Sequence, residues 1–179
     1  MEEFVLYNSH LEIKPFKTKF ITKKFINFLN DKKVNQFLTT KKKKQSLPSA
    51  KSYYLKMKKE KNLYHGIFDR KKNKIIGTIT LRKKNFKTSY VGIMIGDRKY
   101  QGTKYTSNAL NVYLDHAFRL LGFKFVEAGV HKHNLSSAFF FHMNGFKFNK
   151  KERNILFLTL SQKKFIKNIS YKFKPESQK

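Results

Sequence analysis

Two hydrophobic periods alternate along this chain, and the change between them predicts the order of its elements. A period of two runs through residues 63–69, 74–81 and 89–95, which are β-rich and separated by turns of lysine, asparagine and aspartate. In KIIGTITL, at 74–81, both faces can be covered, as in a sheet that lies between helices. We expect these three runs to form an antiparallel meander.

A period near that of a helix precedes the strands. Apolar residues recur at helical spacing over residues 19–29, and a shorter helical piece follows at 34–38. A third helix is expected after Ser46, because serine and the proline two residues later suit a first helical turn. That helix should end in the lysine cluster at 58–61, and residues 41–44 should form a solvated loop.

The strongest helical pattern follows the third strand. Apolar residues fall at i, i+3, i+4, i+7, i+8 and i+11, at Leu110, Tyr113, Leu114, Ala117, Phe118 and Leu121. Gly122 then stands where a left-handed residue ends a helix. The sequence therefore predicts one long amphipathic helix from about Ser107 to Leu121.

Strands are expected on both sides of this helix. YVGIMIGD at 90–97 precedes it, and VEAGVHKHN at 126–134 follows and leads into a shorter helix that ends at Asn144-Gly145. Strand, helix and strand in this order require a right-handed parallel crossover. Residues 10–16 read as an opening strand, and residues 146–148 and 154–160 as closing strands.

The predicted fold class is α/β: one domain with a central mixed, mostly antiparallel sheet, a parallel βαβ unit, and flanking helices. A length of 179 residues suits a single core. We expect the domain to cover residues 1–165. A basic tail is expected at 166–179, with fraying from Lys163 onwards.

Composition narrows the classes of function. The sequence contains no cysteine, which excludes disulfides and thiolate chemistry and favours the cytoplasm. It shows neither an export signal nor an apolar run long enough to cross a bilayer, so no membrane partner is expected. The net charge is +29, but arginines number only five and lysines are scattered along the whole chain. A nucleic-acid partner is therefore possible but not favoured.

Candidate chemistry lies in the turn RKYQGTKYT at 98–106. A strand, a turn and a helix N-terminus place unpaired backbone amides and the positive end of a helix dipole at one point. Arg98, Lys99 and Lys104 add positive charge, and Gly102 permits close approach of a ligand to the backbone. These features are typical of a site for a diphosphate group.

This segment and its surroundings resemble the GNAT superfamily of acyl-CoA-dependent N-acetyltransferases. The resemblance is greatest to the branch with ribosomal-protein-alanine and amino-sugar acetyltransferases. It spans most of the chain through LEIKPF, KIIGTITL, VGIMIGDRKYQGTKYTSNAL, NVYLDHAFRLLGF and NLSSAFFFHMNGFKF. It implies a GNAT fold, N-acetyltransferase activity, acetyl-CoA as acyl donor, and a small-molecule amine as acceptor.

The resemblance also assigns cofactor-binding residues. The diphosphate loop would be Gln101, Gly102, Thr103, Lys104, Tyr105 and Thr106. Asn134 and Ser137 would contact the cofactor arm, and backbone amides near Met94 and Ile95 would point at the thioester oxygen. Lys104 and Thr106 replace the glycine or alanine usual in the family loop. Phe141 replaces the family tyrosine that protonates the leaving thiolate, and phenylalanine cannot donate a proton.

Glu127 is the first candidate for the catalytic base or for a group that orients water, and His131 is the second. Both lie on the strand at 126–134 with Gly129 between them, at positions that share one face. A salt-bridged strand glutamate and a polar surface histidine remain the alternatives. His131 and His133 on one strand suit a metal site poorly, so no metal is expected. The three consecutive phenylalanines at 139–141 read as core.

The acceptor expected from the family analogy and the charge is an anionic amino-sugar nucleotide of surface polysaccharide synthesis. Alternatives are a protein N-terminus, or a catalytically silent module that binds RNA or an acidic partner. Glu127→Gln should lower turnover more than cofactor affinity, and Asn134→Ala should do the reverse. The sequence does not determine the oligomeric state.

Overall fold

A single eight-stranded sheet organises the computed structural model, which describes residues 4–37 and 44–170. The strand order across the sheet is β1-β2-β3-β4-β5-β6-β8-β7. The strands are β1 Leu6–Tyr7, β2 Leu11–Pro15, β3 Leu63–Asp69, β4 Lys74–Lys83, β5 Thr88–Ile95, β6 Phe125–His131, β7 Lys147–Glu152 and β8 Ile155–Ser161. Neighbours pair antiparallel except β5 and β6, which are parallel. The expected meander, crossover and fold class are confirmed.

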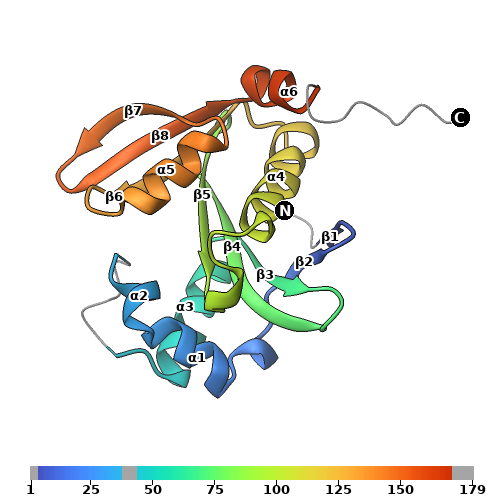
Figure 1. Ribbon diagram of the computed structural model, residues 1–179, viewed down its shortest axis with the longest axis vertical. Helices are drawn as coiled ribbons and strands as arrows, with labels where there is room; N and C mark the ends of the chain where they lie inside the picture. Colours follow the sequence, from blue (N-terminus) through green and yellow to red (C-terminus); the bar gives the residue numbers. More distant parts are fainter. Residues whose placement is uncertain (1–3, 38–43, 171–179) are drawn as a thin grey trace, which may run out of the picture.

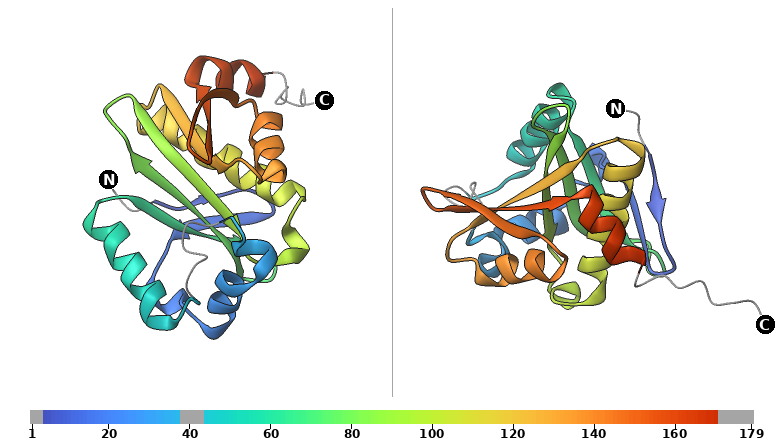
Figure 2. Two further views of the ribbon diagram at one scale, coloured as in Figure 1. Left: turned by 90° about the vertical axis from the view of Figure 1, so that its left-hand side faces the viewer. Right: turned by 90° about the horizontal axis from the view of Figure 1, so that it is seen from above.

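Helices cover both faces of the sheet (Figures 1 and 2). On one face lie α1 Lys23–Asn30, α2 Lys32–Asn35 and α3 Leu47–Lys59, after the 3₁₀ turn η1 Thr18–Phe20. On the other face lie α4 Lys104–Asp115, α5 Leu135–Met143 and α6 Gln162–Ser170. A 3₁₀ turn η2, Arg98–Tyr100, precedes α4, and a π-helical segment η3, His116–Leu120, extends it. We call these two faces the α1 face and the α4 face.

The main core lies on the α4 face. It joins the buried side of α4, including Leu110 and Leu114, to strand residues such as Val126 and Ala128, and all four are fully buried. Phe141 from α5 and Phe165 from α6 complete this core. On the α1 face, Phe16 packs against Phe25 and Tyr64 in a separate aromatic cluster. Apolar side chains that alternate between the two faces of the strands therefore pack into two cores, one on each face of the sheet.

The parallel strands β5 and β6 separate about halfway along their length. Pairing between β5 and β6 joins Thr88 to Phe125, Ser89 to Val126 and Tyr90 to Glu127, and ends there. Beyond this point β5 continues to Ile95 and β6 continues to His131, each paired only with its outer neighbour. Figure 1 shows β6, β7 and β8 turning away from β5. The sheet therefore opens into a V whose apex is the Tyr90–Glu127 pair.

Three details differ from the sequence-based expectations. The long helix begins at Lys104 rather than near Ser107, because Thr103 caps it. The segment from Lys163 does not fray at once: it continues α6 to Ser170, and Phe165 is buried under the sheet. Of the three consecutive phenylalanines, only Phe141 is buried, whereas Phe139 is 64% exposed. Residues 41–43 of the expected loop and tail residues 171–179 lie outside the described residues.

Candidate active site

Backbone amides at the start of α4 form the clearest binding feature of the site. The amides of Gln101, Tyr105 and Thr106 are engaged, by the carbonyl of Arg98, the hydroxyl of Thr103 and the carbonyl of Thr103 respectively. Those of Gly102, Thr103 and Lys104 have no acceptor in the part of the chain that the structure describes. Three adjacent unpaired amides at the positive end of a 12-residue helix form a site for an anion.

The sequence creates this arrangement through Gly102 and Thr103. Gly102 has φ +68°, a left-handed conformation that a residue with a Cβ adopts at a cost. Thr103 takes the extended conformation of an N-cap, and its hydroxyl accepts from the Tyr105 amide. Lys104, Tyr105 and Thr106, which were expected in the loop, are therefore the first helical residues. Only Gln101, Gly102 and Thr103 form the turn itself.

A buried polar contact anchors this turn to the sheet. The Tyr100 hydroxyl donates to the Asp69 carboxylate at 2.5 Å, and both residues are buried. Burial alone would raise the pKa of Asp69, but hydrogen bonds from Tyr100 and from the Lys72 amide lower it overall. The Tyr100 carbonyl in turn accepts from the hydroxyls of Thr103 and Thr106. The end of β3 thus positions the start of α4.

Ile95 presents its backbone to the open V. The Gly96 amide donates to the Ile76 carbonyl on β4, and backbone direction alternates along an antiparallel pair. The amide of Met94 therefore points toward β4, whereas the amide and carbonyl of Ile95 point toward the gap. The Gln101 side chain donates to that carbonyl at 2.8 Å and so lies at the mouth of the V. Of the two amides expected at the thioester, the alternation favours Ile95.

Helix α5 contacts α4 through its C-terminal end, which the sequence did not indicate. Asn134 caps α5 by accepting from the Ser137 amide at 3.1 Å, so its side-chain oxygen already has a structural role. The hydrogen bond between α5 and α4 is made at the other end of α5, from Asn144 to the Ser107 hydroxyl at 3.5 Å. A polar asparagine before glycine at a helix end gave only a capping signal, so this contact was not foreseen.

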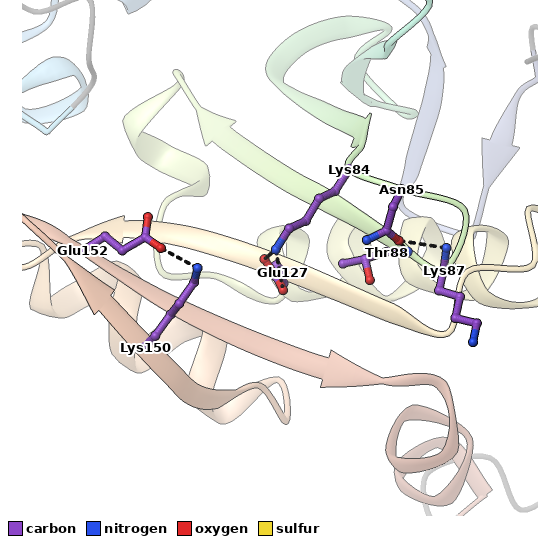
Figure 3. Close-up of polar contacts among 7 residues, drawn as sticks. All are labelled: Lys84, Asn85, Lys87, Thr88, Glu127, Lys150 and Glu152. Atoms are coloured by element: carbon purple, nitrogen blue, oxygen red, sulfur yellow. Dashed lines mark hydrogen bonds and ion pairs between the residues drawn. The ribbon is translucent and has the colours of Figure 1, made fainter.

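Glu127 lies at the apex of the V and is paired with Lys84 (Figure 3). The two carboxylate oxygens accept from the Lys84 ammonium at 3.2 and 2.9 Å, and Glu127 is only 6% exposed. The hydrogen bond to Glu127 raises the pKa of Lys84, with a smaller contribution from Tyr90. The carboxylate is thus held at the apex of the V, with both oxygens engaged by Lys84.

Lys84 is itself fixed by the turn between β4 and β5. Its amide donates to the Thr88 carbonyl, and the Asn85 side chain accepts from the amides of Lys87 and Thr88 at 2.9 and 2.8 Å. Figure 3 shows Lys84 reaching from this turn to Glu127 on β6. Lysine at this position looked like one of many surface charges in the sequence, and only the register of the parallel strands reveals its partner.

The structure places His131 at the far end of β6. It shares the α1 face with Glu127, because Val126 before Glu127 and Ala128 and Val130 after it face the main core. Four residues of extended strand, about 13 Å, separate the two side chains. The His133 amide donates to His131 Nδ1 at 3.3 Å, and the ring stacks on Phe37. At this separation the two candidates do not form a catalytic pair.

Phe141 is 5% exposed and packs edge-on against Phe146. The position that carries a tyrosine in the family therefore belongs to the hydrophobic core in this chain. Proton donation to a leaving thiolate from this position is excluded, as expected from the sequence.

Together these elements define a class of protein: a single α/β domain whose sheet opens between two parallel strands beside a helix N-terminus with free amides. A family model described as "Acetyltransferase (GNAT) domain" matches residues 10–147. The chain therefore belongs to the GNAT family. It is an N-acetyltransferase, and its acyl donor is acetyl-CoA.

Solved structures with the same fold are numerous and distant in sequence. A GNAT-family acetyltransferase from Bacillus anthracis has a TM-score of 0.77 at 15% identity, over 89% of this chain and 99% of that one. Spermidine N-acetyltransferase from Vibrio cholerae, in complex with CoA and spermine, has a TM-score of 0.75 at 17% identity, over 89% and 99%. Apo FdhC, a nucleotide-linked sugar GNAT, has a TM-score of 0.78 at 18% identity, over 96% and 98%. No curated protein matches the chain at a significant level.

The residues present fit acetyl-CoA. The three free amides of Gly102, Thr103 and Lys104 suit its diphosphate, and the V between β5 and β6 leads from them toward the Ile95 amide. Within the described ranges, no helix is long and apolar enough to cross a membrane.

Proposed function

We propose that the chain acetylates the primary amine of an anionic small molecule, specifically of an amino-sugar nucleotide used in surface polysaccharide synthesis. The observation that supports this proposal is that the described carboxylates are already paired with other side chains. Each of the eight aspartates and glutamates within residues 4–37 and 44–170 already has an ion pair or a hydrogen bond to another side chain. The pairs are Glu12–Lys14, Asp31–Arg98, Glu60–Lys56, Asp69–Tyr100, Asp97–Lys74, Asp115–Arg119, Glu127–Lys84 and Glu152–Lys150.

This state disfavours a polycationic acceptor. A polyamine would have to displace an internal partner from a carboxylate at each point of attachment, whereas an anionic acceptor meets a surface with a large excess of lysine. The formal charge of +29 raises the local concentration of anions and speeds their capture. The nucleotide-linked sugar GNAT among the structural neighbours is consistent with such an acceptor.

Backbone amides and one carboxylate of the chain would have separate roles in acetyl transfer. Bound acetyl-CoA supplies an activated thioester. The amides of Gly102, Thr103 and Lys104 hold a diphosphate, and the Ile95 amide donates a hydrogen bond toward negative charge that develops in the gap. Glu127 accepts the amine proton through water, because its register partner Tyr90 lies five residues, about 16 Å of extended strand, from Ile95. The lack of cysteine favours the cytoplasm as the place of action.

A thiol-release assay with acetyl-CoA over a panel of amines tests the acceptor class. The panel contains a nucleotide-linked amino sugar, free glucosamine, spermidine and a short peptide with an N-terminal alanine. We expect kcat/KM for the nucleotide-linked sugar to exceed that for glucosamine by about tenfold or more, which is the effect of one or two charge-assisted contacts. Preference for spermidine or for the peptide would overturn the acceptor class. Salt-dependent RNA binding without thiol release from any amine would instead support the non-catalytic alternative.

A further inference from the structure

A cavity of about 610 Å³ opens on the α1 face, away from α4. Among the residues that line it are Phe68 and Ile75, which are register partners on β3 and β4. Ile67 and Ile76 beside them belong to the main core on the α4 face, so Phe68 and Ile75 point the other way. The cavity volume is in the range of small-molecule sites.

Three lysines surround this cavity: Lys14, Lys17 and Lys19. Lys14 is paired with Glu12 and lies 4.4 Å above the Phe68 ring. Lys17 and Lys19 are exposed and have no carboxylate partner in the part of the chain that the structure describes. Among the lining residues there is no aspartate or glutamate. The cavity therefore carries an uncompensated positive charge.

The walls add polar and apolar contacts of a kind that a small organic anion uses. Phe20 and Phe68, which contact each other edge-on, form the apolar part, and Asn73 from the β3–β4 turn adds an amide. Thr22 lines the same cavity and is the N-cap of α1. The positive end of the α1 dipole thus adds to the field of the lysines.

We propose that this cavity is a second anion site, which binds a small molecule through a diphosphate group. Lys17 and Lys19 pair with the phosphate oxygens, Lys14 and Asn73 donate hydrogen bonds, and the two phenylalanines contact an organic part of the ligand. The site shares no residue with Gln101–Thr106, and the sheet lies between the cavity and the main core under α4. It goes beyond the acetyl-transfer reaction, because neither the acyl donor nor the amine is required for it to fill.

Calorimetric titration of the full chain with inorganic pyrophosphate at low ionic strength tests the site, with saturating acetyl-CoA present so that the free amides of α4 are already occupied. The test variant is Lys17→Gln/Lys19→Gln. The control for net charge is Lys58→Gln/Lys59→Gln, which removes two exposed lysines from α3. Thermal unfolding checks that each variant is folded.

We expect Lys17→Gln/Lys19→Gln to weaken pyrophosphate binding at least about tenfold, while Lys58→Gln/Lys59→Gln changes it less than about threefold. Equal weakening in the α3 double variant would mean a response to net charge alone, and pyrophosphate binding that saturating acetyl-CoA abolishes would place the anion at α4. Either result would overturn the proposal, as would no binding to the wild type. A second arm with ADP separates the sources of the diphosphate: tighter binding of ADP than of pyrophosphate, lost in the same variant, identifies a nucleotide.

Discussion

At the scale of single residues, this protein depends on a few buried polar contacts that the sequence does not single out. Glu127 and Asp69 are almost fully buried. Lys84 holds Glu127, and the Tyr100 hydroxyl and the Lys72 amide hold Asp69. A buried charge without its partner destabilises the fold, so these donors contribute more to stability than the many exposed lysines do. Two predictions belong to this scale.

Glu127→Gln should lower kcat for acetyl transfer by about two to four orders of magnitude, the usual contribution of general base catalysis. The KM for acetyl-CoA should change little, because the free amides of α4 are untouched. Steady-state kinetics measure both constants. Glu152→Gln removes another lysine-paired carboxylate, from exposed β7, and serves as the matched control. A Glu127→Gln variant with the kcat of this control would remove Glu127 from the mechanism.

Tyr100→Phe should destabilise the fold by about 1–3 kcal/mol, because it leaves the buried Asp69 carboxylate without its strongest donor. Denaturant unfolding measures this change. Tyr105→Phe is the control: Tyr105 packs edge-on against Tyr100, and its hydroxyl has no hydrogen-bond partner within the described residues. Equal stability of the two variants would contradict the anchoring role of Tyr100.

At the scale of elements, the start of α4 links local sequence to cofactor binding. Apolar periodicity located the body of this helix but not its first turn, where Lys104, Tyr105 and Thr106 carry no periodic signal. Capping by Thr103 and the left-handed Gly102 determine the true start. The same two residues leave the amides free, so helix initiation and anion binding have a single cause.

Gly102→Ala should raise the KM for acetyl-CoA by about threefold to tenfold while kcat changes little, because strain at φ +68° shifts the free amides. Gly122→Ala is a close control at the other end of the helical segment. Gly122 has φ +72°, and at both glycines an added Cβ would have no heavy atom within 4 Å. Both variants should therefore lose similar stability, about 1–2 kcal/mol, and only Gly102→Ala should affect the KM. Equal KM values would separate this turn from the cofactor.

At the scale of the whole molecule, the sheet separates two cores, and the main core contains a buried histidine pair. Nδ1 of His65 on β3 and the Tyr113 hydroxyl are hydrogen-bonded at 3.0 Å. Phe4 stacks on His65 and contacts His116. Burial lowers the pKa of His65 to about 4 and also lowers the pKa of His116. Both rings are therefore neutral in the folded protein near pH 7.

This burial predicts that stability falls as the pH drops from about 6.5 to about 4. In that window the unfolded chain binds a proton at His65 and the folded chain does not, so unfolding is favoured by up to about 3 kcal/mol. His65→Gln should flatten the dependence of the unfolding midpoint on pH in this window. His142→Gln, which changes an exposed histidine, should leave it as in the wild type. Identical slopes in the His65 variant and the wild type would refute this origin.

The sequence by itself determined the order of the elements, the fold class, the turn that precedes the long helix and the loss of the proton donor at position 141. These features are local: periodicity, turn residues and residue type act over a few positions, so they can be read directly. The sequence also placed Glu127 and His131 on one face, because strand alternation is local as well. It did not show that Glu127 pairs with Lys84 or that His131 accepts from the His133 amide.

Only the tertiary structure decided which residues meet across strands and helices. The Lys84–Glu127 pair, the Tyr100–Asp69 anchor, the Asn144–Ser107 contact and the lysine-lined cavity each join segments far apart in the chain. The opening of the V was equally hidden, because it depends on where pairing between β5 and β6 stops. Such contacts are set by strand register and by packing on a shared sheet, and neither leaves a periodic pattern in the residues involved.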